Sequence, residues 1–171
     1  MGSSAVVIVA AGQGRRLGLG PKALVTLDGE ILLARVANAA RAAGFSRIIA
    51  VLPPGVTCPI TNMDCAVNAE PASGALGSVV SALRALEERH AITDLVVWPV
   101  DHPWVGGDQL SDLRRAARSS GRDVARVVPV WAGRRGHPVW VRSPGLIRLR
   151  SVESVLDGTL RDHLVAAGET L

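Results

Sequence analysis

The sequence predicts an α/β fold: a single three-layer domain in which helices cover both faces of a mostly parallel, twisted sheet. Short apolar runs typical of buried strands alternate along the chain with longer amphipathic stretches typical of helices. The first apolar run ends in a glycine-rich loop, the usual place for a ligand in such sheets. A length of 171 residues favours one domain, residues 1–171, around its own core.

The chain begins with a strand, a short extended segment and a helix. Residues 5–10 are continuously apolar and β-branched, which is typical of a strand buried on both faces. Residues 24–27 predict a short extended segment before the turn at Asp28–Gly29. Residues 31–43 are rich in alanine and carry leucine and valine on one face, so they predict a helix that Gly44 ends.

The alternation continues through the middle of the chain. Residues 47–52 predict a second strand, because the run is apolar and two prolines follow it. A third, shorter strand is expected at residues 65–67. Residues 74–90 predict a helix with one apolar stripe, and residues 95–100 predict a strand that ends at Asp101.

The last part of the chain repeats the pattern with shorter elements. The expected elements are a helix over 108–119, a strand over 125–131, a turn over 133–138, a returning strand over 139–142 and two short helical stretches near 144–150 and 159–167. Helices between strands imply right-handed crossovers, so the carboxyl ends of the strands meet at one edge of the sheet. The glycine-rich loop, Asp101 and the turn at 133–138 are expected at that edge.

Composition and charge narrow the function classes. Hydrophobic residues make up 48% of the chain and charged residues 20%, which is typical of a globular protein. No apolar run approaches the ~20 residues of a membrane span, and no signal peptide is apparent, so a cytoplasmic protein without a membrane partner is expected. The net charge of +4 suits anionic small molecules. Nucleic acid is not an expected partner, because basic residues and stacking aromatics do not cluster together.

The cysteines and the lysine are each few in number. Cys58 and Cys65 are the only cysteines, and their spacing fits no zinc site, so free thiols are expected.

Eighteen of the nineteen basic residues are arginine, and Lys22 is the single lysine. Chance is one explanation of that exception, since three of the nineteen basic residues lie in the same loop; the functional explanation is that a compact ammonium is needed where an arginine fork does not serve.

The glycine-rich loop over residues 6–22 reads VVIVAAGQGRRLGLGPK. It is not a Walker A loop, because Ala23 follows Lys22 where a hydroxyl for magnesium is required. It fits the dinucleotide fingerprint poorly, because one residue too many precedes Gly18 and no acidic residue ends the second strand. A different phosphate-binding loop is therefore expected.

Four blocks in order resemble the nucleotidyltransferases of the MobA-like family. The opening signature of that family, L-A-[AG]-G-x-[SG]-x-R-[ML]-G-x-x-x-K, is similar to residues 9–22, with Val9 in its first position and Leu17 in place of methionine. Residues 68–78 (NAEPASGALGS), 99–103 (PVDHP) and 133–139 (GRRGHPV) resemble the later blocks, the last one that of the branch acting on molybdopterin. Residues 156–161 (LDGTLR) loosely match a further G-D-x-G-A-R element. The resemblance spans nearly the whole chain and implies a Rossmann-like, glycosyltransferase-A-like nucleotidyltransferase fold.

The resemblance implies Mg²⁺-dependent transfer of a nucleoside monophosphate from a nucleoside triphosphate to a phosphate-bearing small-molecule acceptor. Lys22 and Arg16 would neutralise the triphosphate, and Asp101 would hold Mg²⁺. The competing interpretations are a surface position for Arg16 and a helix cap for Asp101. CTP is favoured over GTP, because Ala-Ala-Gly is typical of cytidylyl members, although sugar-nucleotide relatives also carry it.

The same resemblance assigns the binding residues. The nucleotide-binding residues would be Ala10, Ala11, Gly12, Gly14, Gly18, Lys22, Asn68, Gly74 and Ser78. Capping and turn roles are an equal alternative for Asn68 and Ser78. The acceptor would be molybdopterin cofactor, bound by His102, Arg135 and His137; a loop role for His102 and a simple hairpin turn at the other two are the alternatives. A molybdoenzyme or a second copy of the chain would be the protein partner.

The sequence leaves two rivals open. One is a sugar-phosphate nucleotidyltransferase, and the other is a nucleotide-binding protein without turnover. The second arises because family members usually end in a further strand and an acidic segment that can supply another metal ligand, for which Asp157 and Asp162 are weak substitutes. Lys22 and Asp101 argue for catalysis, because both keep the chemical type that the reaction needs.

Overall fold

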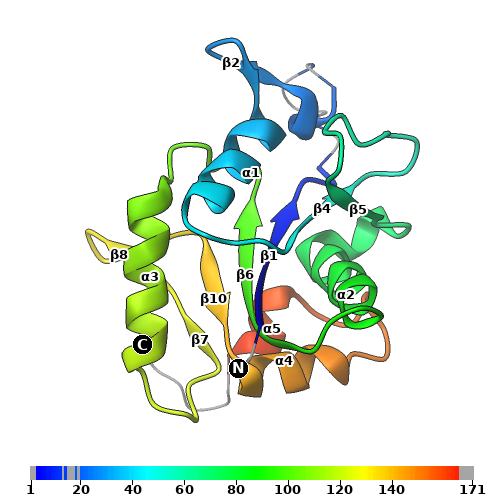
Figure 1. The fold of residues 1–171 in the computed structure, drawn as a ribbon. Helices are drawn as coiled ribbons and strands as arrows, with labels where there is room; N and C mark the ends of the chain where they lie inside the picture. The colour runs from blue at the N-terminus through cyan, green and yellow to red at the C-terminus, as the bar shows by residue number, and fades with distance from the viewer. Residues whose placement is uncertain (1–2, 13, 15–17, 19, 166–171) are drawn as a thin grey trace.

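The computed structural model describes residues 3–12, 14, 18 and 20–165, and confirms the expected α/β fold (Figure 1). Its main sheet has the strand order β5-β4-β1-β6-β10-β7. Neighbours among β5, β4, β1 and β6 pair in parallel, and β10 is antiparallel to both β6 and β7. The bounds of these strands are β1 (Ser3–Val9), β4 (Ile48–Leu52), β5 (Asp64–Val67), β6 (Ile92–Pro99), β7 (Arg126–Val127) and β10 (Val139–Val141).

Helices cover both faces of this sheet (Figure 1). One face packs against α1 (Leu32–Ala42) and α3 (Gly107–Ser119), the other against α2 (Gly74–Glu87), α4 (Ser143–Arg150) and α5 (Leu160–Leu164). Successive side chains of a strand enter opposite cores, as Val6 and Val7 do in β1. A strand in this position needs apolar residues on both sides, which is why the sequence of β1 is a continuous apolar run.

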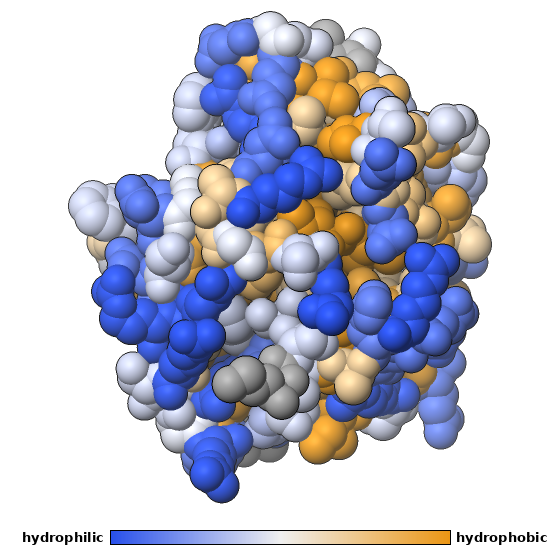
Figure 2. All heavy atoms as spheres, in the orientation of Figure 1, coloured by the Kyte–Doolittle hydropathy of each residue, from blue (hydrophilic) through white to orange (hydrophobic). Residues whose placement is uncertain are grey.

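The helices follow the predicted sequence signals. Gly44 has φ 79° after α1, and the N–H groups of Gly44 and Phe45 donate to the carbonyls of Arg41 and Ala40 at 2.8 and 3.1 Å. This is the Schellman arrangement that a glycine permits, so the expected helix end is confirmed. The solvent face of α3 is covered by hydrophilic side chains on the left of Figure 2, while Leu110, Leu113 and Ala117 face the core.

Two predicted segments differ from the structure. The strand expected over 125–131 is divided into β7 and β8 (Val130–Trp131), because Pro129 lacks the N–H that a continuous ladder requires. β8 forms a hairpin with β9 (Arg134–Arg135), and the two residues between them have positive φ, as two-residue hairpin loops need. Residues 22–31 also contain more regular secondary structure than expected. Its elements are η1 (Lys22–Leu24), β2 (Thr26–Leu27) and β3 (Glu30–Ile31).

The expectation of free thiols is wrong in this structure. Cys58 and Cys65 are paired as a disulfide with their Cα atoms 6.4 Å apart. The spacing of seven residues carried no signal for the pair; the loop after β4 folds back beside β5 and brings the sulfur atoms together. Separately, among the described residues no helix has the length and apolar character that crossing a membrane requires.

Candidate active site

The carboxyl ends of three parallel strands meet at one edge of the sheet and carry most of the predicted site. β1 leads into the glycine-rich loop, β5 into Asn68 and β6 into Asp101. Main-chain hydrogen bonds just beyond the strands fix these segments: the N–H of Val100 donates to Val9 O at 3.1 Å and that of Asn68 to Leu52 O at 3.0 Å. The fold thus positions residues that are far apart in sequence side by side.

A cavity of about 270 Å³ lies at this edge. It brings together seven of the predicted residues. They are Ala11, Gly12, Lys22, Asn68, Gly74, Ser78 and Asp101. Val9, Pro71, Ala75, Pro99 and Val100 complete the lining of the small cavity and were not predicted, because they are apolar residues whose position depends only on packing.

The glycine-rich loop returns to its starting point. The N–H of Lys22 donates to Gly12 O at 3.2 Å, which closes the loop and brings the lysine beside the end of β1. Gly14 has φ 61°, and a Cβ atom there would lie 1.9 Å from the carbonyl oxygen of Gly20. Only glycine fits at this position, so the loop depends on it. Arg16, predicted to act in catalysis, lies outside the described residues.

Lys22 and Asp101 form an ion pair inside the small cavity. The Lys22 ammonium donates to Asp101 Oδ2 at 2.6 Å, and the two side chains remain 33% and 45% exposed. Burial alone would raise the pKa of the Asp101 carboxyl, but the hydrogen bond and the positive charge of Lys22 outweigh it, so this pKa lies below its usual value. Asp101 is therefore an anion at neutral pH.

The turn that carries Asp101 is anchored in the core. The indole N–H of the fully buried Trp98 donates to His102 O at 3.1 Å, and the N–H of His102 donates to Pro99 O at 3.1 Å. Asp101 is the single carboxylate among the described residues that line the small cavity. Across the described part of the chain, no three His, Cys, Asp or Glu side chains form a metal cluster. One carboxylate completed by waters and substrate phosphates suits Mg²⁺, whereas a metal held by protein alone would need more ligands.

Asn68 and Ser78 are engaged in hydrogen bonds within the protein. Asn68 Nδ2 donates to Gly74 O and to Ser78 Oγ, both at 3.2 Å, and Ser73 Oγ donates to Asn68 Oδ1 at 3.3 Å. The three polar side chains are buried, so these bonds satisfy groups that would otherwise be costly. The network joins the first turn of α2 to the end of β5 without a side-chain cap on its N-cap residue, Ser73, so these contacts are of the turn kind.

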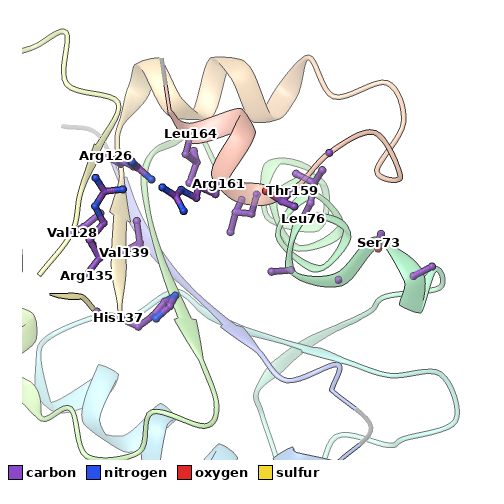
Figure 3. Close-up of a pocket in the computed structure, with 16 residues that line it drawn as sticks. Ser73, Leu76, Arg126, Val128, Arg135, His137, Val139, Thr159, Arg161 and Leu164 are labelled. Atoms are coloured by element: carbon purple, nitrogen blue, oxygen red, sulfur yellow. The ribbon is translucent and has the colours of Figure 1, made fainter. Parts of the chain in front are cut away.

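A second cavity of about 590 Å³ adjoins the first. Both are lined by Gly74 and Ala75, so the first turn of α2 is their common wall. The large cavity is lined by the predicted residues Arg135 and His137 (Figure 3). The His137 and His102 rings are in contact, with centroids 4.8 Å apart, which connects the large cavity to the Asp101 turn. Burial lowers the pKa of His137, the charge of His102 lowers it further and Asp101 partly opposes the shift, so His137 is mainly neutral at pH 7.

Some predicted residues lie outside both cavities. The side chain of Ala10 is fully buried in the core between the sheet and α1, and Ala10 lines neither cavity. Gly14, Gly18 and His102 line neither cavity. Conversely, Arg126 and Arg161 line the large cavity and were not predicted as site residues. The sequence signal for Arg161 was the segment 156–161.

The two cavities are lined by largely successive parts of the sequence. Every described residue of the small cavity lies between positions 9 and 101. The large cavity is formed by residues 72–76 at the start of α2 and by residues 126–164. The smaller and the larger cavity therefore come from largely successive parts of the chain.

Known proteins resemble this chain in sequence and in fold. The sequence profile of the MobA-like NTP transferase domain matches residues 6–169. A molybdenum cofactor guanylyltransferase from Rhodopseudomonas palustris (strain HaA2) is 31% identical over 159 residues, which cover 91% of this chain and 72% of that relative. A 2-C-methyl-D-erythritol 4-phosphate cytidylyltransferase from Deinococcus radiodurans is 48% identical over 56 residues, 33% of this chain and 24% of that relative. The solved structure of Rv0371c from Mycobacterium tuberculosis H37Rv in complex with manganese has a TM-score of 0.68 at 22% identity, covering 88% of this chain and 76% of that one, a likeness of fold.

Proposed function

Because the chain belongs to the MobA-like NTP transferase family, we propose that it transfers a nucleoside monophosphate, CMP in preference to GMP, to the phosphate of molybdopterin cofactor. An oxygen of the acceptor phosphate attacks the α-phosphorus of the triphosphate, and the bond from that phosphorus to the bridging oxygen breaks as pyrophosphate leaves. The observation that carries this proposal is the pair of adjoining cavities: one contains Lys22 and Asp101, the other Arg135 and His137.

Charge is the first obstacle to this reaction, because both reactants are anions. Two unit charges about 4 Å apart repel by about 4 kcal/mol at an effective dielectric of about 20. Left uncompensated, that repulsion costs roughly a thousandfold in rate. Lys22 supplies a positive charge at the end of the glycine-rich loop, and Arg16 is proposed to add a second. The ammonium of Lys22 would lie at the α-phosphate, where negative charge grows as the reaction proceeds.

Asp101 has two alternative partners in this scheme. Without nucleotide its carboxylate accepts a hydrogen bond from Lys22. With nucleotide we propose that it holds Mg²⁺, which would screen the phosphate charges when bound. Lys22 is then free to turn toward the phosphates. The half-exposed position of both side chains supports this exchange, since neither needs the core to move.

The choice of base rests on Ala11 and on two relatives. The Ala10-Ala11-Gly12 segment is similar to that of cytidylyl members, and the short match to a cytidylyltransferase points the same way. The longer match is to a guanylyltransferase and favours GTP. Ala11 lines the small cavity, so it is placed to contact a ligand bound there. We therefore propose CTP as the preferred substrate, with GTP as the alternative.

A second candidate acceptor is 2-C-methyl-D-erythritol 4-phosphate. The 48% identity over 56 residues to a cytidylyltransferase of this acceptor favours it. Its body is a small polyol, whereas the walls of the large cavity are mainly apolar and basic. Molybdopterin, with a planar ring system, is the better match to such walls.

The test measures pyrophosphate release with Mg²⁺, either CTP or GTP, and either molybdopterin or 2-C-methyl-D-erythritol 4-phosphate. We expect CTP with molybdopterin to be the fastest combination. The variant Asp101→Asn should lose this activity while keeping its circular dichroism spectrum, because the change removes charge but little volume. Faster release with GTP would contradict the choice of base, and a preference for the polyol phosphate would contradict the acceptor. No release with any combination would leave a non-catalytic nucleotide-binding protein.

A further inference from the structure

A third cavity, of about 140 Å³, lies at the amino ends of the strands, away from the two cavities described above. It is lined by Ser4 of β1 and Asp94 of β6, which are partners in the strand register. β1 and β6 both run upward in Figure 1, so this cavity is near the lower edge of the sheet, whereas Asp101 follows the upper end of β6. The rest of the described lining is Arg114, Ala117, Arg118, Trp140 and Arg142. None of these residues lines either of the other two cavities.

Three of the lining residues are arginines, and one of them is engaged with other groups. The Arg142 guanidinium donates to the carbonyl and the hydroxyl oxygen of Ser120, at 3.1 and 2.9 Å. It also lies 3.9 Å from Asp94, the single carboxylate of the described lining. Asp94 accepts two further hydrogen bonds, from the indole N–H of Trp140 at 3.1 Å and from the Thr93 hydroxyl at 3.2 Å. Arg142 and Asp94 therefore form an ion pair whose two members are fixed by further bonds.

The guanidinium groups of Arg114 and Arg118 have no such partner. Within the described part of the chain, neither of them forms a hydrogen bond or an ion pair. They are four residues apart on α3, so they lie on the same face of the helix, and like charges at this spacing repel. Burial lowers the pKa of Arg114 and the charge of Arg118 lowers it further, whereas a carboxylate in contact would raise it. The positive charge of this pair is therefore not balanced by a described carboxylate in contact with it.

Arg114 is held in place by an aromatic platform. Its guanidinium carbon lies 4.3 Å from the ring centroid of Phe45, and the Phe45 and Trp140 rings are in contact, with centroids 5.9 Å apart. Both rings are almost fully buried, so the platform is part of the core. A guanidinium that is stacked on a ring keeps its N–H edge free to donate two parallel hydrogen bonds to an oxyanion. The Ser4 hydroxyl, in the lining of the same cavity, can supply a further donor.

We propose that the third cavity is a binding site for a small oxyanion of the phosphate or sulfate class, held between Arg114 and Arg118. The bound anion offsets the repulsion between the two guanidinium groups and accepts hydrogen bonds from both. The volume of about 140 Å³ is below the ~300 Å³ at which sites for drug-sized ligands begin, which favours a small anion over a whole nucleotide. The site does not depend on the proposed function, because neither arginine lines a cavity assigned to nucleotide or acceptor.

The test measures the Tm of the full chain in increasing sodium sulfate, with the ionic strength held constant by sodium chloride. We expect a saturable rise in Tm, of roughly 3–6 °C at about ten times the Kd, because an ion that binds only the folded chain stabilises it. Arg118→Gln should weaken the affinity for sulfate about tenfold, the effect of one lost charge-assisted contact. Arg118→Lys should restore part of the affinity, because it keeps the charge but not the planar fork.

Arg115→Gln is the matched control. Arg115 is exposed on the same helix, pairs with Asp112 at 3.0 Å and does not line the third cavity, so the net charge changes equally while the site is kept. This variant should bind sulfate as the parent does. Unchanged affinity in Arg118→Gln, an equal loss in both variants, or a parent without a saturable rise would each refute the site. Lys22→Gln identifies binding in the small cavity: if that variant, and not Arg118→Gln, removes the rise, the proposal is wrong.

Discussion

At the scale of single residues, the site depends on two opposite charges that are 79 positions apart in the sequence. Lys22 and Asp101 follow different strands of one parallel sheet, so the fold itself brings them to the same edge. This much could be predicted from sequence. The place of Arg126 and Arg161 in one cavity could not, because it depends on how α5 packs on α2 and α4, which no local pattern encodes. The role of Ala10 at the nucleotide stays a prediction, although its side chain is fully buried in the core.

Lys22→Arg tests whether the single lysine takes part in the reaction. The charge is kept, and a half-exposed position tolerates the larger group, so we expect the free energy of unfolding to stay within about 0.5 kcal/mol of the parent. The compact Lys22 ammonium lies 2.6 Å from Asp101, a position that the larger, planar arginine fork does not reproduce. A displacement of about 1 Å costs on the order of a hundredfold in rate, and we expect a loss of kcat of that size. Steady-state pyrophosphate release measures this kcat, and undiminished turnover would show that Lys22 has no catalytic role.

At the scale of elements, the first turn of α2 is constrained in several ways at once. It separates the two cavities, it carries Gly74 at φ 58°, and its buried network joins Asn68, Ser73 and Ser78. The sequence predicted the helix and its first residue. It left the roles of Asn68 and Ser78 open, because the same side chains suit a cap or a ligand, and only the partners of their atoms decide. The prediction of one strand over 125–131 was wrong for a different reason. It gave the apolar character of the segment more weight than Pro129, which interrupts the strand.

Gly77→Ala should disrupt this turn. In an ordinary helix interior alanine is more stable than glycine by about 0.5–1 kcal/mol. Here the new Cβ atom would lie 1.7 Å from Ser73 Oγ, so the serine must move and its bond to Asn68 is lost. We expect the free energy of unfolding to fall by about 1–3 kcal/mol in urea titrations, with weaker nucleotide binding.

Gly107→Ala is the matched control for that variant. Gly107 is also helical, but a Cβ atom there would make only ordinary contacts, at 3.7 Å or more. This variant should be as stable as the parent or more so. If Gly77→Ala behaves in the same way as Gly107→Ala, the network at α2 does not constrain the fold.

At the scale of the whole molecule, the layers and the strand pairing followed from alternation along the chain, because a parallel sheet needs helices on both faces. What the sequence did not reveal is the second cavity, whose size depends on the gap between α5 and β10. The disulfide between Cys58 and Cys65 was also missed, since it depends on the path of a loop.

Nucleotide binding should stabilise the whole fold. A ligand at about a hundred times its Kd adds about 2.7 kcal/mol. For a chain of this size that is a rise in Tm of roughly 5–10 °C. We expect Mg²⁺ with CTP to produce such a shift and CTP with a chelator to produce a smaller one, because Asp101 then keeps Lys22. Thermal denaturation monitored by circular dichroism measures both, and the absence of a shift with all four triphosphates would remove the basis for a nucleotide site.

The order in which the chain builds its two cavities has an evolutionary consequence. Residues up to Asp101 line the small cavity, and those from Arg126 onward supply most of the large one. Under the proposed function, substitutions among residues 126–164 would change the acceptor without altering the residues that hold the triphosphate. Among the described residues, Gly74 and Ala75 in the first turn of α2 line both cavities, so substitutions there would affect both. Under that assignment, a change of acceptor specificity needs no new catalytic residues.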